Sequence, residues 1–98
     1  MKKYFLYILT DKKNGSLHID ITDDIVNSVI EFKKRRTEFL KKKDRYFLVY
    51  YEEAGNIISA IKYKKKMKRW KKFWLDTLID KCNPQWDDLN KETEDINN

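Results

Sequence analysis

The sequence predicts a small α+β domain in which helices flank a three-stranded antiparallel sheet, in the order β-β-α-β-α-α. Three observations lead to this fold class. Apolar and polar residues alternate near the start of the chain, which is typical of strands, whereas later apolar residues recur at helical spacing. A run of aromatic and β-branched residues separates two of the helical stretches. The length of 98 residues and the hydrophobic content of 41% are sufficient for one modest core.

A β-hairpin is expected first. The runs Tyr4–Leu9 and Leu17–Ile21 are rich in apolar residues, and the turn between them contains Asn14-Gly15. This dipeptide is a strong hairpin signal because both residue types tolerate a positive φ. In the second run, apolar residues alternate with His18 and Asp20, so these two polar side chains should share one face of the sheet.

A helix and a third strand are expected next. The helix should run from Asp24 to about Arg36, because Asp23 or Asp24 can cap its N-terminus and apolar residues then recur at helical spacing. Basic residues at its end suit the negative pole of the helix dipole. The stretch Arg45–Glu52 is aromatic and β-branched, which predicts a central strand.

Two further helices complete the predicted domain. Asn56 can cap a helix that opens with Ile57, Ile58 and Ile61 and continues through Met67. A third helical segment should end near Lys81, and its apolar face comprises Trp70, Phe73, Trp74, Thr77 and Leu78. Helical spacing favours core packing for both apolar stripes, and stacking on nucleic-acid bases is the alternative for the aromatic residues.

Residues 1–86 are expected to form the domain, and residues 87–98 a flexible acidic tail. The tail contains five acidic residues and one lysine, so it carries a charge of −4 and residues 1–86 carry +10. A charged segment with so little apolar content buries too little surface to offset the entropy of ordering. The segment Asn83-Pro84 should end the preceding helix, because proline disfavours a helical conformation in the residue before it.

The overall charge favours a polyanionic partner. The formal charge is +6 and the isoelectric point is about 9.3. Cys82 is the only cysteine, which excludes a disulfide within the chain and a zinc cluster built on cysteines. No apolar run is long enough to span a membrane or to serve as a signal peptide, so we expect a cytoplasmic protein and no membrane partner.

One segment concentrates the positive charge, since eight of the eleven residues from 62 to 72 are Lys or Arg. Like charges one helical turn apart repel each other, so such a segment usually meets an anion. A solvated helix face, or a lysine-rich composition inherited from an AT-rich genome, is the alternative interpretation. The candidate nucleic-acid-binding residues are Lys62, Lys64, Lys65, Lys66, Lys68, Arg69, Lys71 and Lys72.

Several short motifs together resemble a known family. Phe5–Leu9 lies where a GIY-YIG domain carries its first motif, with Tyr7 at the motif tyrosine, and His18–Asp20 lies where the Tyr-Ile-Gly motif belongs. The most specific match is Trp70 after a basic helix, followed by Asn83–Trp86 in the form Asn-Pro-x-Trp. The chain therefore resembles a small stand-alone UvrC-like GIY-YIG domain of the kind found in bacteria.

The resemblance extends from Tyr4 to about Leu89 and implies the GIY-YIG fold of the endonuclease superfamily. Members with the full motif hydrolyse phosphodiesters using one divalent metal, two tyrosines, an arginine and a glutamate. This chain retains Tyr7 as the first tyrosine. The positions that the resemblance assigns to the second tyrosine, the glycine, the arginine, a nearby histidine and the glutamate carry His18, Asp20, Ser28, Phe32 and Lys64.

These replacements imply a catalytically inactive, nucleic-acid-binding domain in which Tyr7 and His18 occupy vestigial catalytic positions. A lysine at position 64 repels a metal ion, and Asp20 adds bulk and negative charge where a phosphate would approach. Loss of the arginine removes a preorganised contact to the transition state. We therefore expect no cofactor and no metal site, with Asp20 as the only outside candidate ligand, and a partner that is DNA or RNA.

Two alternatives differ from this interpretation. A weak or altered metal-dependent nuclease would use Tyr7, His18 and Asp20 with Mg²⁺ or Mn²⁺, because a histidine near carboxylates can bind a metal or act as a base. A protein-interaction module for an acidic partner is the other alternative. In that case the acidic tail would fold back over the basic residues.

Overall fold

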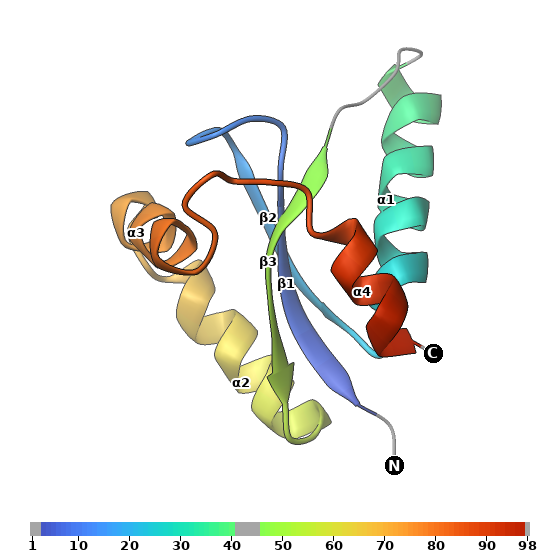
Figure 1. The fold of residues 1–98 in the computed structure, drawn as a ribbon. Helices are drawn as coiled ribbons and strands as arrows, with labels where there is room; N and C mark the ends of the chain where they lie inside the picture. Colours follow the sequence, from blue (N-terminus) through green and yellow to red (C-terminus); the bar gives the residue numbers. More distant parts are fainter. Residues whose placement is uncertain (1–2, 41–45, 98) are drawn as a thin grey trace.

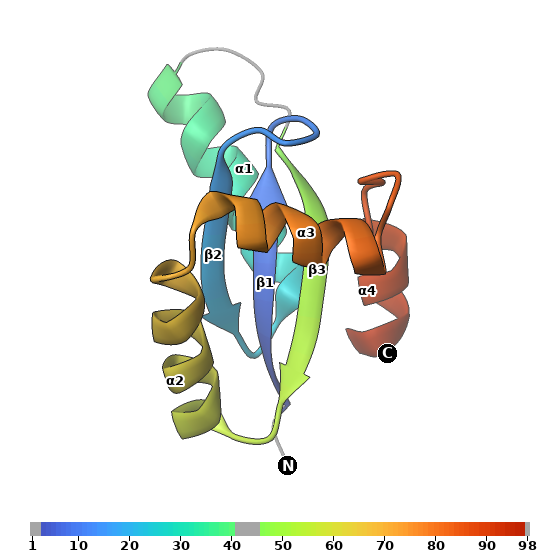
Figure 2. The same ribbon diagram turned by 90° about the vertical axis from the view of Figure 1, so that its left-hand side faces the viewer.

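The computed structural model describes residues 3–40 and 46–97 and contains an α+β fold built on a three-stranded antiparallel sheet. Strand β1 lies in the centre between β2 and β3 (Figure 2). The strands are β1 (Tyr4–Thr10), β2 (Leu17–Thr22) and β3 (Phe47–Ala54), and the helices are α1 (Ile25–Leu40), α2 (Ile57–Lys68), α3 (Lys72–Cys82) and α4 (Asn90–Asn97). The predicted fold class and the order of its six elements are confirmed.

Helices cover both faces of the sheet. Figures 1 and 2 show α1 and α4 on one face and α2 and α3 on the other. Alternate residues of β1 pack against the helices on opposite faces of the sheet. Tyr7 and Leu9 pack in a cluster with Val29 of α1, whereas Ile8 packs in a second cluster with Met67 of α2. The central strand is therefore buried on both faces, which explains why its apolar run is nearly continuous.

The hairpin turn uses Asn14 and Gly15 in different ways. Asn14 adopts the left-handed conformation, with a φ of 59°, whereas Gly15 does not have a positive φ. A Cβ atom at Gly15 would lie 2.9 Å from the carbonyl oxygen of Lys12, which accepts a hydrogen bond from the Gly15 amide. Gly15 is thus required because the backbone approaches closely, and Asn14 alone supplies the left-handed residue.

Two helices begin at their predicted caps. The Asp24 carboxylate accepts a hydrogen bond from the Asn27 amide at 3.1 Å, and the Asn56 side chain accepts one from the Ser59 amide at 2.8 Å. Helix α1 continues to Leu40, beyond its predicted end near Arg36, because lysine and arginine are good helix formers and no glycine or proline interrupts the segment.

The third strand is displaced from its predicted bounds. It was expected as a central strand at Arg45–Glu52 and is observed at Phe47–Ala54, while Arg45 lies outside the described residues. The predicted central position is wrong, because β1 pairs with both other strands and β3 lies at an edge of the sheet. Glu53 and Ala54 extend the strand because they pair with the start of β1, where Phe5 is opposite Glu53. Pairing with a neighbouring strand thus overrides the weak strand preference of these two residues.

The apolar stripe of α2 differs from the prediction. Ala60 and Met67 face the sheet and are buried, whereas Ile57, Ile58 and Ile61 are exposed, Ile58 by 64%. Ala60, Lys64 and Met67 lie on one side of the helix, at spacings of four and three residues. A small residue at position 60 lets the helix backbone approach the sheet, and this approach turns the isoleucines away from the core.

Helix α3 also presents a different stripe to the core. Leu75 and Ile79 are buried, and Leu78 packs against the same cluster. Phe73 and Trp74 were expected in the core but are 72% and 54% exposed. Because Leu75 and Ile79 are four residues apart, they form a helical stripe of their own, and packing that stripe rotates Phe73 and Trp74 into solvent.

The Asn-Pro-x-Trp segment has a structural role. The Asn83 amide group donates to the carbonyl oxygens of Val49 and Asp87 at 3.1 and 2.9 Å, and its oxygen accepts from the Asp87 amide. Trp86 is buried with a φ of 54°, and its indole nitrogen donates to Asp80 at 2.6 Å. This turn ends α3 and directs the chain back across the sheet.

The segment after Trp86, which we expected to be a flexible acidic tail, makes hydrogen bonds with β3 in its described part. The Leu89 amide donates to the Leu48 carbonyl at 2.8 Å, and the Leu48 amide donates to the Asp88 carboxylate at 3.3 Å. Helix α4 then packs beside α1, and Thr93 is fully buried. Contacts with β3 and α1 thus continue beyond the expected boundary at residue 86, because the Asn83–Trp86 turn fixes the direction of the segment that follows.

Candidate functional site

Tyr7 lies at the centre of a small polar cluster formed by β1, β2 and α1. Its ring is buried, it is opposite Asp20 in the register of β1 and β2, and its hydroxyl is hydrogen-bonded to Ser28. Burial, together with the negative charge of Asp20, raises the pKa of Tyr7 to about 12. Tyr7 is therefore a neutral phenol at physiological pH.

His18 and Asp20 share one face of β2, as the alternation predicted. The His18 Nε2 atom lies 3.8 Å from Asp20 Oδ2, and the His18 ring stacks on Phe32 with 4.4 Å between ring centroids. Burial lowers the pKa of His18, and the cations Lys68, Lys64 and Arg36 lower it further, although Asp20 opposes them. The imidazole is therefore held in its neutral form.

Lys64 of α2 reaches Asp20 at the sheet edge. Its Nζ atom lies 2.8 Å from Asp20 Oδ1, which also accepts a hydrogen bond from the Ile21 amide at 2.8 Å. Burial alone would raise the pKa of Asp20, but the hydrogen bond from Lys64 and the one from the Ile21 amide lower it overall. The Lys64 ammonium group is thus paired with the Asp20 carboxylate, which was the one candidate metal ligand.

Asp24, which follows β2, stabilises the start of α1. The Asp24 side chain caps the helix by accepting from the Asn27 amide, and the Asp24 backbone amide donates to the Thr22 hydroxyl at 2.9 Å. The Thr22 hydroxyl lies 2.6 Å from the Ser28 hydroxyl. Within residues 3–40 and 46–97, no three His, Cys, Asp or Glu side chains are grouped so that they could hold a metal ion. The carboxylate of Asp24 is oriented toward the helix backbone.

An aromatic and cationic row extends this cluster and was not predicted. Phe32 contacts Tyr46 with 5.2 Å between ring centroids, and the Arg36 guanidinium lies 4.4 Å from the centroid of Tyr46. The spacing of Phe32 and Arg36, four residues apart on one helix, was the available signal. We had interpreted Arg36 only as a helix-terminal charge.

The candidate nucleic-acid-binding residues divide into two groups. Lys64 pairs with Asp20, and Lys72 pairs with Asp76 at 2.9 Å and donates to the Asn14 carbonyl at 2.9 Å. The other six cations are exposed. We call this group the basic surface, and its members are Lys62, Lys65, Lys66, Lys68, Arg69 and Lys71.

Four of these cations line a groove along α2. Lys62, Lys65, Lys66 and Arg69 recur at helical spacing on the side that faces away from the sheet, and with Trp70 they line a groove of about 420 Å³. The Lys66 Nζ atom lies 5.9 Å from the Trp70 ring centroid. Trp70 also lines a second hollow, of about 450 Å³, with Lys68 and Lys72 among its other residues. The groove can accept an extended anion.

The acidic segment, by which we mean the described residues 87–97, does not cover the basic surface. Asp88 lies 4.0 Å from Lys33 of α1, and α4 contacts α1, whereas α2 lies on the opposite face of the sheet (Figure 1). The proposal that residues 87–98 fold back over the lysines of α2 is therefore wrong for the described part of this segment. Its hydrogen bonds to Leu48 hold it on the other side of the molecule.

Comparisons with protein-family models, with curated proteins and with solved structures gave no match to this chain. None of the helices in the described part of the chain combines the length and apolar character that crossing a membrane requires. The features of the molecule that bear on its function are therefore the polar cluster at Tyr7 and the basic surface.

Proposed function

We propose that this chain is a catalytically inactive member of the GIY-YIG endonuclease superfamily that binds DNA or RNA through the basic surface of α2. The observation that supports binding most directly is the row of four exposed cations that lines one groove. Phosphates neutralised by these side chains would release condensed counterions, so binding would be independent of sequence and would weaken steeply with salt.

The arrangement around Tyr7 supports the inactive assignment. Ser28 forms a hydrogen bond with Tyr7, and Lys64 forms an ion pair with Asp20. Residues at the motif positions therefore come together from β1, β2, α1 and α2. In this cluster a lysine takes the place that the family gives to a metal-binding carboxylate. Because the ammonium already compensates the charge of Asp20, a divalent cation would have to displace it.

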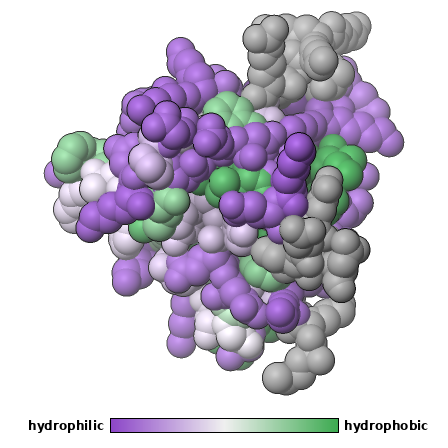
Figure 3. Space-filling view, viewed as in Figure 1, coloured by the Kyte–Doolittle hydropathy of each residue, from purple (hydrophilic) through white to green (hydrophobic). Residues whose placement is uncertain are grey.

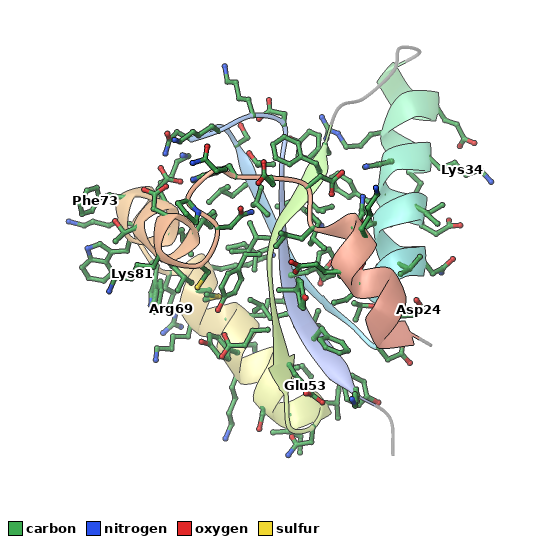
Figure 4. The ribbon with its side chains drawn as sticks, in the orientation of Figure 1. Asp24, Lys34, Glu53, Arg69, Phe73 and Lys81 are labelled. Atoms are coloured by element: carbon green, nitrogen blue, oxygen red, sulfur yellow. The ribbon has the colours of Figure 1, made fainter. Side chains whose placement is uncertain are left out.

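Binding can be measured by fluorescence anisotropy with labelled single-stranded DNA, RNA and duplex DNA at salt concentrations from about 50 to 200 mM. The double variant Lys65→Glu/Lys66→Glu should bind more weakly and should reduce the salt slope by about 0.7 for each lost single-strand phosphate contact. Lys34→Glu is the matched control, since Lys34 lies on α1 at the opposite side of the molecule (Figure 4). Native protein that binds no nucleic acid at low salt would exclude this function.

A weak or altered metal-dependent nuclease is the second candidate, because His18, Asp20 and Tyr7 lie close together. Incubation with plasmid, single-stranded DNA and RNA in the presence of Mg²⁺ or Mn²⁺ tests it. We expect no cleavage. Metal-dependent cleavage that disappears in both His18→Ala and Tyr7→Phe would show that the site is active, and the inactive assignment would then be wrong.

A cytoplasmic location forms part of the proposal. The single cysteine, Cys82, is exposed and is a free thiol, which fits a reducing compartment. Binding to an acidic protein partner remains the alternative use of the basic surface. Competition by nucleic acid for the same lysines would distinguish the two uses.

A further inference from the structure

Two large aromatic side chains are exposed at the start of α3. Phe73 and Trp74 are 72% and 54% exposed, although each could bury a large apolar area. Figure 3 shows hydrophobic and pale surface at the left-hand side, next to hydrophilic surface. Figure 4 shows Phe73 there, projecting away from the sheet, with Arg69 labelled on the same side of the molecule. The core does not use these two residues, which we call the aromatic pair.

The aromatic pair is connected to the basic groove through Trp70. The rings of Trp70 and Trp74 meet edge to face, with 6.4 Å between their centroids. Trp70 also lines the groove formed by Lys62, Lys65, Lys66 and Arg69. An extended ligand in the groove would therefore reach the exposed rings immediately beyond Trp70.

We propose that the junction of α2 and α3 is a binding site for single-stranded nucleic acid, in which phosphates lie in the basic groove and unpaired bases stack on Phe73 and Trp74. This inference rests on the proposed function and specifies its ligand. Proteins that bind single strands without sequence preference combine a positively charged groove with exposed aromatic rings, since every base has a face that can stack. The bases of a duplex are already stacked on one another and cannot offer those faces.

The distribution of exposed apolar residues favours this ligand over an anionic membrane. Among the described residues, the other large hydrophobic side chains exposed on this side of the molecule are Ile57, Ile58 and Ile61, in the first half of α2. The 12-residue α2 spans about 18 Å, so Ile57 and Ile58 lie near the end of the helix that is far from Phe73. The cations lie between these groups, which separates them instead of forming one insertion face.

The test compares probes of equal length that differ in whether unpaired bases are available for stacking. The probes are labelled strands of about 16 nucleotides, one of deoxythymidine and one abasic, and a duplex of equal length. The proteins are the native chain, Phe73→Ala/Trp74→Ala, the conservative variant Trp74→Phe, and Ile30→Ala as a control. Ile30 is 56% exposed and lies on α1, away from the junction.

We expect the double alanine variant to bind the thymidine strand at least roughly tenfold more weakly, because stacking contributes substantially for each base. The same variant should bind the abasic strand as the native protein does. Trp74→Phe should retain most of the affinity, and Ile30→Ala should retain all of it. Native protein should prefer the thymidine strand to both the abasic strand and the duplex.

Other outcomes would overturn the inference in distinguishable ways. If the aromatic variants bind normally but Lys65→Glu/Lys66→Glu weakens all probes, the basic surface binds phosphate alone and stacking is excluded. If Phe73 and Trp74 are needed for anionic phosphatidylserine vesicles but not for the thymidine strand, the junction is a membrane site. If no nucleic acid binds, the proposed function fails together with this inference.

Discussion

At the scale of single residues, the ion pair between Asp20 and Lys64 explains how two unusual charges are accommodated beside Tyr7. Their side chains are 36% and 29% exposed, so the pair is partly shielded from solvent. The Ile21 amide supplies a second hydrogen bond to the same carboxylate oxygen. Each charge is therefore stabilised by the other, and replacing one alone should reveal what the pair contributes.

Replacing Lys64 with glutamate should reverse its effect. Lys64→Glu places a second carboxylate near Asp20, so we expect the free energy of unfolding to fall by about 1 kcal/mol. Mn²⁺ should restore part of the loss, since two carboxylates can share a divalent ion. Urea denaturation with and without Mn²⁺ measures both effects, and Lys64→Met is the control that removes charge only. Equal stability of the two variants, with no response to the metal, would contradict this account.

The state of His18 gives a prediction for pH. Because the pKa of His18 is lowered in the fold from its ordinary value of 6.5, the unfolded chain binds a proton there more readily than the native protein does. Stability should therefore decrease as the pH falls below about 6.5. His18→Asn should remove this part of the decrease. Denaturation at neutral and mildly acidic pH measures it, and an identical pH dependence in the variant would be the contrary result.

At the scale of elements, the choice of helix face determines which residues are available for function. Spacing alone allowed two stripes on α3, one through Phe73 and Trp74 and the other through Leu75 and Ile79. Leu75 and Ile79 pack against the sheet, because their aliphatic side chains fill the space above Ile8 and Val49. Helical periodicity does not distinguish stripes that are one residue apart, so the exposed aromatic pair was recognised only in the structure.

Helix α2 offers a direct test of its orientation. Ala60 is fully buried against the sheet, so Ala60→Leu should overpack the contact and cost about 1–3 kcal/mol of unfolding free energy. Ile58 is 64% exposed, so Ile58→Ala should change stability by no more than about 0.5 kcal/mol. Urea denaturation of both variants provides the comparison. A larger cost for Ile58→Ala would mean that the isoleucines face the core.

At the scale of the whole molecule, the fold places the acidic segment and the basic surface on opposite sides of the sheet. The acidic segment and α1 lie on one face of the sheet, and the basic surface lies on the other. The hairpin and the shared face of His18 and Asp20 were predictable because they follow from local alternation and turn chemistry. The strand order was not, because the composition of Arg45–Glu52 indicated a central strand whereas β3 lies at an edge of the sheet. The position of the acidic segment was not predictable either, because Leu89 is isolated in a polar sequence and its amide donates to Leu48 in the distant strand β3.

Asn83 should control that segment. Asn83→Ala removes its hydrogen bonds to Val49 and Asp87, so we expect a loss of about 2–3 kcal/mol and faster exchange of the α4 amide protons. Hydrogen exchange followed by mass spectrometry measures the second effect. Asn83→Asp keeps the acceptor but lacks the donor, and it should fall between the native protein and the alanine variant. Unchanged exchange in α4 would show that the segment is held by other contacts.

The central claim is that nucleic acid binds along α2 and not at the polar cluster around Tyr7. The most direct measurement is a residue-by-residue NMR titration of the backbone amides with a short single-stranded oligonucleotide at low salt. If nucleic acid binds in the groove along α2, we expect shifts at the residues that line it, and these shifts should reverse as salt is added. The residues are Lys62, Lys65, Lys66, Arg69 and Trp70. Shifts confined to Tyr7, His18 and Ser28, or no shifts at all, would contradict it.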